Sequence, residues 1–116
     1  MLLTVDRHEG QGITVLRLRG ELDHFTGERL QAIVRECLGL RRRRFILNLR
    51  DVTYMTPTGV AILGNIYVQI VREGGQMKLC SLTPFVETLM RHTAFLSYFE
   101  RYEDEEAASN SFARAA

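Results

Sequence analysis

Hydrophobic and polar residues follow two different periods along this chain, and the period separates predicted strands from predicted helices. Residues 13–19 alternate between the two kinds, so that Leu16 and Leu18 point to one side and the arginines to the other. This two-residue period is typical of a half-buried strand. A shorter apolar stretch begins at Leu3, and the segment 9–12 between the two stretches supplies glycines that permit positive φ in a turn. The start of the chain is therefore predicted to form an antiparallel hairpin.

The next segment has the 3.6-residue period of a helix. Its apolar residues stand at i, i+3, i+4, i+7 and i+8, which places them on one helix face. These residues are Leu30, Ile33, Val34, Cys37 and Leu38. Asp23 or Thr26 can cap the first turn of this helix, and Gly39 suits its end.

A second helix is predicted to begin beside Pro57. Thr56 is a good N-cap, and proline is favoured at the first helical position because the N–H it lacks would have no partner there. The apolar stripe of this helix consists of Val60, Leu63, Ile66, Tyr67, Ile70 and Val71. Ile62 and Asn65 lie off that stripe. Ile62 is therefore either an exposed anchor for a partner or a residue covered by another helix.

The remaining segments complete an alternation of strands and helices. Residues 45–49 are almost continuously hydrophobic, as central strands covered on both faces usually are. Short strands are predicted within 77–80 and 96–102, with a third helix opening at Pro84 between them. The order β-β-α-β-α-β-α-β, followed by a terminal helix or a frayed tail over 103–116, predicts a single α/β domain. Its mixed sheet has four to five strands and is entered by the antiparallel hairpin.

Composition and charge exclude several classes of protein. The 116 residues fit one domain, and 15 Lys and Arg against 14 Asp and Glu leave a net charge of +1. Nucleic-acid binding is not expected, because neutralising phosphates requires a basic excess. No apolar run approaches the roughly 20 residues that cross a bilayer, and the first residues do not form a signal peptide. Cys37 and Cys80 stand in apolar patterns, so we expect buried thiols in a reducing cytoplasm.

The sequence contains no recognisable catalytic or metal-binding motif. Gly59 and Gly64 have the glycine spacing of a phosphate loop, but Asn65 and Ile66 stand where its Lys and Ser or Thr belong. No histidine lies at metal-ligand spacing from another histidine or a cysteine. We therefore expect a protein that is not an enzyme and holds no cofactor or metal.

Two other features have ordinary structural interpretations. Asp23 and His24, close to Thr26, are interpreted as a helix cap and a surface histidine rather than as a hydrolytic constellation. The arginine run 41–44 is interpreted as a solvated connector, because it is short, lacks interleaved aromatic residues and leads directly into apolar sequence.

One segment remains unusual. Residues 56–59, Thr-Pro-Thr-Gly, place two hydroxyls at a predicted helix N-terminus directly after a central strand. In open α/β sheets, function collects beyond the carboxyl ends of the strands, and a helix N-terminus suits an anion such as phosphate. Asp23, which opens the preceding helix, can lie beside this segment. An ordinary cap followed by a proline remains the structural alternative.

Four ordered segments resemble the STAS domain of bacterial anti-sigma factor antagonists. They are residues 20–24 (Gly-Glu-Leu-Asp-His), 46–52 (Ile-Leu-Asn-Leu-Arg-Asp-Val), 55–60 (with Met55, Gly59 and Val60) and 74–80. The resemblance runs from about residue 3 to residue 102. It implies a small cytoplasmic α/β domain without catalytic activity. Such proteins bind an anti-sigma factor, which is often also a serine kinase using ATP, and so free a sigma factor.

The resemblance also implies a phosphorylation switch, and this sequence departs from it. In the family, the kinase phosphorylates a serine that opens the second helix, within Asp-Ser-Ser-Gly or Asp-Ser-Thr-Gly, and a phosphatase reverses the reaction. Here Thr56 replaces the aspartate, Pro57 occupies the position of the phosphorylated serine, and Thr58 matches the second hydroxyl residue. Asp23 matches the acidic residue near the phosphorylation site.

Two interpretations of this departure are open. Either the switch is lost and binding is constitutive or set by the partner's abundance, or Thr56 or Thr58 has become the acceptor. We favour loss, because in-line phosphoryl transfer needs an aligned oxygen. A shift of one residue at a helix start turns the side chain by about 100° around the axis.

The expected partner-binding face is the start of the second helix and its neighbours. Its residues are Asp23, His24, Thr56, Pro57, Thr58, Gly59, Ile62 and Asn65. The expected oligomeric state is a monomer or a weak dimer. Two other functions are considered: a STAS subunit of a membrane lipid-transport complex bound to a cytoplasmic ABC ATPase, and a module binding a small anion or nucleotide at the second helix.

Overall fold

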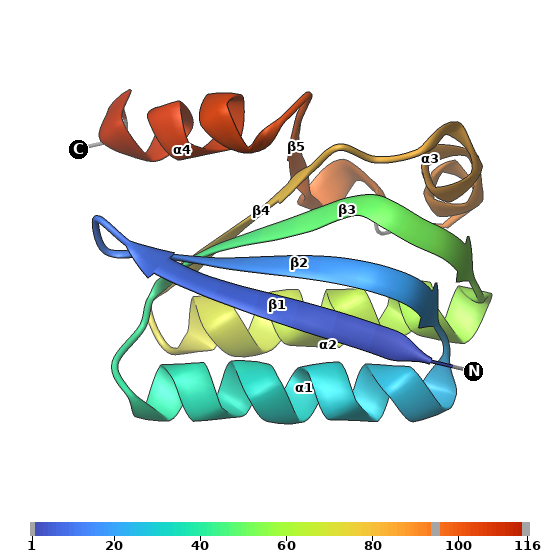
Figure 1. Ribbon diagram of the computed structural model, residues 1–116, viewed down its shortest axis with the longest axis horizontal. Coiled ribbons are helices and arrows are strands. Elements are labelled where there is room, and N and C mark those ends of the chain that lie inside the picture. The colour runs from blue at the N-terminus through green and yellow to red at the C-terminus, as the bar shows by residue number, and fades with distance from the viewer. Residues whose placement is uncertain (1, 94–95, 115–116) are drawn as a thin grey trace.

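A computed structural model describes residues 2–93 and 96–114 of the chain as one α/β domain (Figure 1). The elements are β1 (Leu3–Gly10), β2 (Ile13–Leu22), α1 (His24–Gly39), β3 (Arg44–Met55), α2 (Pro57–Arg72), β4 (Gln76–Cys80), α3 (Pro84–Arg91), a 3-10 turn (Leu96–Tyr98), β5 (Glu100–Tyr102) and α4 (Glu105–Arg114). This order confirms the predicted alternation, and the terminal segment, for which a helix and a frayed tail were both open, forms α4. The last two residues of the predicted tail, 115 and 116, lie outside the described residues.

The five strands form one mixed sheet in the order β1-β2-β3-β4-β5. β1 and β2 pair antiparallel from Leu3 opposite Gly20 to Gly10 opposite Ile13, and the other three pairings are parallel. Gln11 and Gly12 make the hairpin turn with φ values of 55° and 76°, which explains the glycine. The predicted antiparallel entry into a largely parallel sheet is therefore confirmed.

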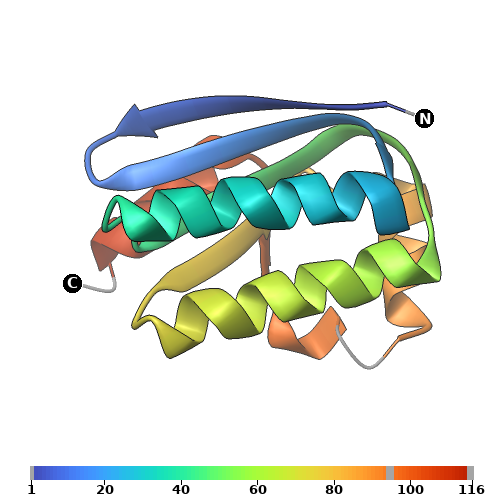
Figure 2. The ribbon, with the colours of Figure 1, turned by 90° about the horizontal axis from the view of Figure 1, so that it is seen from below.

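Helices cover the two faces of the sheet unequally. α1 and α2 lie side by side on one face (Figure 2), whereas α4 lies on the opposite face (Figure 1). β3 occupies the centre and is covered on both sides, as predicted. Phe45 and Leu47 point into the main core beneath α1 and α2, and Ile46 packs with Phe112 of α4 in a separate, smaller cluster.

Several boundaries differ from the sequence-based expectation. β3 continues past Leu49 to Met55 because its second half pairs with the end of β2, although a bulge shifts the register there. The final strand covers only Glu100–Tyr102, after the 3-10 turn. Val71, expected on the apolar stripe of α2, is exposed.

The arginine run between α1 and β3 contributes to the fold rather than serving only as a solvated connector. Arg43 donates at 2.9 Å to the carbonyl oxygen of Leu38 at the end of α1, which also accepts from the Arg41 N–H at 3.0 Å. Arg42 lies 3.3 Å from the Glu9 carboxylate. Arg44 stacks over the Phe112 ring at 5.8 Å.

Candidate functional site

Three helices begin at the same edge of the sheet, where β2, β3 and β4 end (Figure 1). α1, α2 and α3 are capped by Asp23, Thr56 and Thr83, respectively. This arrangement follows from parallel strands, whose carboxyl ends meet at one edge. We call the region formed by the helix starts at Asp23, Thr56 and Thr83 and by the strand ends before them the carboxyl edge.

The Asp23 side chain caps the N-terminus of α1. Its Oδ1 accepts hydrogen bonds from the backbone N–H groups of Phe25 at 2.9 Å and Thr26 at 3.0 Å, while Thr26 Oγ1 accepts from the Asp23 N–H at 3.0 Å. These bonds, the Thr26 N–H foremost, lower the pKa of the Asp23 carboxyl. The predicted capping role is confirmed, and His24 beside it is exposed, 3.3 Å from the Glu28 carboxylate.

The α2 start holds its two threonines in different settings. Thr56 Oγ1 accepts from the Gly59 N–H at 3.0 Å, as an N-cap does, and Pro57 takes the first helical position. Thr58 is exposed at the second position, and within the part of the chain that the structure describes its hydroxyl makes no hydrogen bond. The predicted cap is therefore confirmed, and only one of the two hydroxyls takes part in it.

Close backbone packing joins the α2 start to the end of β2. The Thr56 N–H donates to the Leu22 carbonyl oxygen at 3.1 Å. Gly59 is buried against the same carbonyl, so that a Cβ at this position would overlap with it. Since Asp23 directly follows Leu22, the structure brings Asp23 beside the Thr-Pro-Thr-Gly segment, as the sequence suggested.

A shallow groove runs from the α2 start between α1 and α2. Its lining residues are His24, Glu28, Gln31, Arg35, Thr58, Ala61, Ile62 and Asn65. The groove therefore brings together four of the predicted site residues, His24, Thr58, Asn65 and the largely buried Ile62.

Three predicted site residues, Asp23, Gly59 and Ile62, are buried, and for Ile62 the burial decides between its two interpretations. Only 7% of it is exposed, and it packs against Gly27 of α1 so closely that a Cβ at Gly27 would overlap with it. The interpretation of Ile62 as an exposed anchor is thus wrong, because the facing glycine lets α1 approach and cover it. The alternative, burial beneath another helix, is confirmed.

Exposed aromatic residues at the carboxyl edge were missed by the sequence analysis. Phe25 is 71% exposed, Tyr54 50% and Phe85 47%, and Tyr54 stacks on Phe85 with ring centroids 5.8 Å apart. Phe25 and Phe85 both occupy the second position of their helices, as Thr58 does in α2. An aromatic residue two positions after a predicted cap, off the apolar stripe, is the sequence signal that points to Phe25 and Phe85.

The described residues hold no group of His, Cys, Asp and Glu side chains suited to a metal ion. None of the helices within the described ranges is long and apolar enough to span a membrane. What the carboxyl edge presents is an outer surface of aromatic rings, hydroxyls and a histidine, which suits contact with another macromolecule.

The sequence profile of the STAS domain matches residues 4–108. The chain belongs to the STAS domain family. It is 26% identical over 106 residues to the anti-sigma F factor antagonist of Paenibacillus polymyxa, covering 90% of this chain and 91% of that protein. It is 29% identical over 115 residues to the Bordetella bronchiseptica protein BtrV, also assigned as an anti-sigma factor antagonist, covering 99% and 97%.

Solved STAS structures share the fold. An anti-sigma factor antagonist from Mycobacterium paratuberculosis superposes with a TM-score of 0.83 at 19% identity, covering 95% of this chain and 93% of that one. The antagonist SpoIIAA has structures in an unphosphorylated form, with a TM-score of 0.72 at 17% identity, and in a phosphorylated form, with 0.70 at 19%. These cover 99% and 95% of this chain and 100% and 99% of SpoIIAA.

Proposed function

We propose that this STAS domain is a non-catalytic anti-sigma factor antagonist that binds an anti-sigma factor of the serine-kinase type through the carboxyl edge. The names of the two sequence relatives support the role. Support for the surface comes from Phe25, Tyr54 and Phe85, since exposed aromatic rings are common anchors of protein interfaces. Binding frees a sigma factor held by the same anti-sigma factor.

We further propose that the phosphorylation switch is lost, and the observation that carries this is Pro57 at the first position of α2. Proline has no hydroxyl, so a kinase directed to this position has no oxygen to phosphorylate. Of the neighbouring hydroxyls, Thr56 Oγ1 is engaged in the cap, and Thr58 is turned by about 100° around the helix axis. The complex is therefore expected to persist in ATP.

Ordinary phosphorylation at such a position would act through charge. A phosphate adds about −1.5 to −2 charges, and at a packed interface this brings like-charge repulsion and a desolvation cost. A chain that cannot carry the phosphate is not released in this way, so its binding is set by the abundance of the two partners.

The test of the lost switch places a hydroxyl at position 57. Pro57→Ser should gain one phosphate by intact-mass spectrometry when mixed with its anti-sigma kinase and ATP, and its affinity should then fall at least tenfold. The matched control is Pro84→Ser, which makes the same change at the first position of α3, also after a threonine cap. Wild type and Pro84→Ser should stay unmodified and bound. Stoichiometric phosphothreonine on the wild type would contradict the lost switch while leaving the binding role intact.

A further inference from the structure

α4 is attached to the sheet separately from the rest of the domain. Within the described residues it is the helix that covers the sheet face opposite α1 and α2 (Figure 1). Among its described side chains, the apolar Ala108 and Phe112 are buried in a cluster with Ile13, Ile46 and Cys80 of the sheet. The main core lies on the other side of the sheet. Loss of α4 would thus leave the main core covered.

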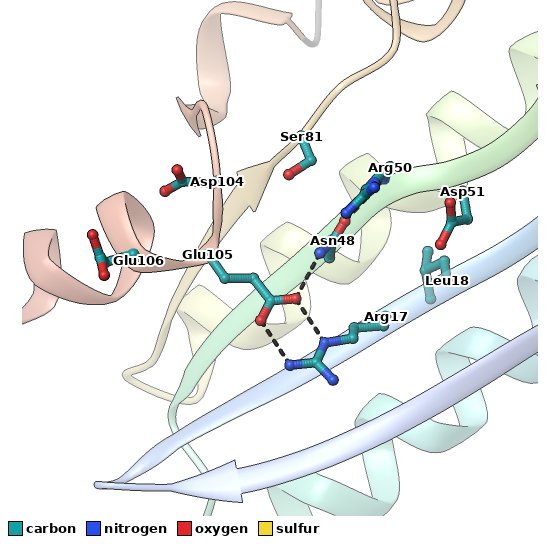
Figure 3. Close-up of a pocket in the computed structure, with 9 residues that line it drawn as sticks. All are labelled: Arg17, Leu18, Asn48, Arg50, Asp51, Ser81, Asp104, Glu105 and Glu106. Atoms are coloured by element: carbon teal, nitrogen blue, oxygen red, sulfur yellow. Dashed lines mark hydrogen bonds and ion pairs between the residues drawn. The ribbon is translucent and has the colours of Figure 1, made fainter.

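The first turn of α4 is held by hydrogen bonds from Arg17 and Asn48 to Glu105, which we call the clasp (Figure 3). The Glu105 carboxylate accepts two hydrogen bonds from the Arg17 guanidinium, at 2.8 and 2.9 Å, and one from Asn48 Nδ2 at 2.6 Å. Both charged side chains remain partly exposed. Water replaces much of such an interaction when it breaks, so the clasp positions α4 without holding it irreversibly.

The far end of α4 covers a buried cation. Lys78 of β4 is buried, and its Nζ donates to Ser111 Oγ at 2.7 Å and lies 4.2 Å from the centre of the Phe112 ring. The Glu100 carboxylate is 3.4 Å from the same nitrogen. Taking an ammonium group out of water carries a large desolvation cost. When α4 leaves the sheet, the Lys78 ammonium group regains its water. The free energy gained in this way offsets part of the cost of exposing Phe112.

We propose that α4 is a displaceable strap, which leaves and rejoins the sheet as one unit while the sheet, α1 and α2 stay folded. Opening uncovers the apolar strip formed by Ile13, Ile46 and Cys80. The inference rests on the segregated cluster, the partly exposed clasp and the buried Lys78 together. Elements with little buried apolar surface and polar attachments belong to the low-stability end of a protein and open without global unfolding.

The two cysteines report on the two faces of the sheet. Cys80 lies beneath α4, whereas Cys37 lies in the main core, and both are fully buried free thiols. Burial raises the pKa of Cys80 to about 11, so the closed state presents a protonated, unreactive thiol. Labelling by an aromatic disulfide reagent therefore measures how often each thiol is uncovered. The full-length Cys37→Ala and Cys80→Ala proteins assign the two signals.

The strap predicts that Cys80 is labelled at least tenfold faster than Cys37 under native conditions. Glu105→Ala, which removes the clasp, should accelerate Cys80 labelling at least threefold and leave Cys37 unchanged. The matched control is Glu106→Ala, which removes the neighbouring exposed carboxylate of the same helical turn. Equal labelling rates for both cysteines would overturn the proposal, because they would show that α4 leaves only when the whole domain unfolds. Equal Cys80 rates in the Glu105 and Glu106 variants would overturn the role of the clasp.

Discussion

The threonines on either side of Pro57 differ in what their hydroxyls do, and this difference underlies the functional proposal. Thr56 Oγ1 accepts the Gly59 N–H and begins α2, while the Thr58 side chain lies exposed along the groove between α1 and α2. A hydroxyl required by the helix cap is a poor candidate for modification, because a phosphate there would displace the cap bond. Proline at the intervening position leaves the helix start intact and removes the acceptor.

Alanine substitutions separate the two threonines. Thr56→Ala should lower the free energy of unfolding by about 1 kcal/mol, because the Gly59 N–H loses its partner at the helix start. Thr58→Ala, two residues away on the exposed side, should change it by less than about 0.5 kcal/mol. Urea unfolding followed by circular dichroism measures both. Equal losses in the two variants would contradict the assignment of the cap to Thr56.

At the residue scale, the sequence predicted side chains that act locally and failed where a second element decides. Caps and the first-position proline follow from residues adjacent in the chain, so Asp23, Thr56 and Pro57 were assigned correctly. The burial of Ile62 depends on Gly27, which lies on a different helix and allows close approach there. No pattern within the second helix contains that information.

Glu105 links the α4 helix to the sheet through charge, so this element should respond to acid. The pKa of the Glu105 carboxyl lies below its ordinary value of 4.5, chiefly because Arg17 donates to the ionised form. A carboxyl with a lowered pKa in the folded state stabilises the fold above its unfolded-state pKa. That stabilisation is lost as the pH falls through the lower, folded-state value.

The resulting prediction concerns the stability difference between wild type and Glu105→Gln. At pH 7 the wild type should be the more stable protein. The difference should shrink as the pH falls from about 4.5, where the unfolded-state carboxyl takes up a proton, through the lower pKa of Glu105 in the folded state. Urea titrations of both proteins between pH 7 and pH 3 provide the measurement. Glu106→Gln is the matched control. A stability difference that stays constant over this range would show that the charge on Glu105 contributes nothing.

At the scale of elements, strong apolar periodicity made α1, α2 and the hairpin predictable. α4 was left open between a helix and a frayed tail, since the apolar side chains that it buries among the described residues are Ala108 and Phe112, and two positions make no stripe. The second half of β3 was missed because polar residues follow Leu49. Its strand conformation comes from pairing with β2, a contact between segments more than 30 residues apart.

In the whole molecule, the edge proposed to bind the partner lies opposite an edge that closes the fold. Among the described residues, the carboxyl edge carries the starts of α1, α2 and α3 and the exposed aromatic residues Phe25, Tyr54 and Phe85. The opposite edge carries the hairpin turn and the arginines that close α1 against β3. The family could be recognised from sequence motifs, but the aromatic surface could not, because it is assembled from α1, β3 and α3.

This arrangement predicts where substitutions reduce binding. Phe25→Ala should weaken the complex with the anti-sigma factor at least tenfold without changing the melting temperature, because the ring is 71% exposed in the free protein. Leu40→Ala is the matched control, since Leu40 is an exposed hydrophobic residue, 58% accessible, just beyond the other end of α1. Isothermal titration calorimetry gives both affinities. Equal affinities for the two variants would remove Phe25 from the interface.

The most direct test of a constitutive antagonist is capture from lysate of the host cell, with the tagged wild type as bait. The bound chains are identified by mass spectrometry, with and without ATP. The account predicts an ATP-binding anti-sigma factor that stays bound in ATP, while the bait carries no phosphate. Release by ATP with phosphate on Thr56 or Thr58 would contradict the lost switch, and capture of a transporter ATPase in its place would contradict the antagonist role.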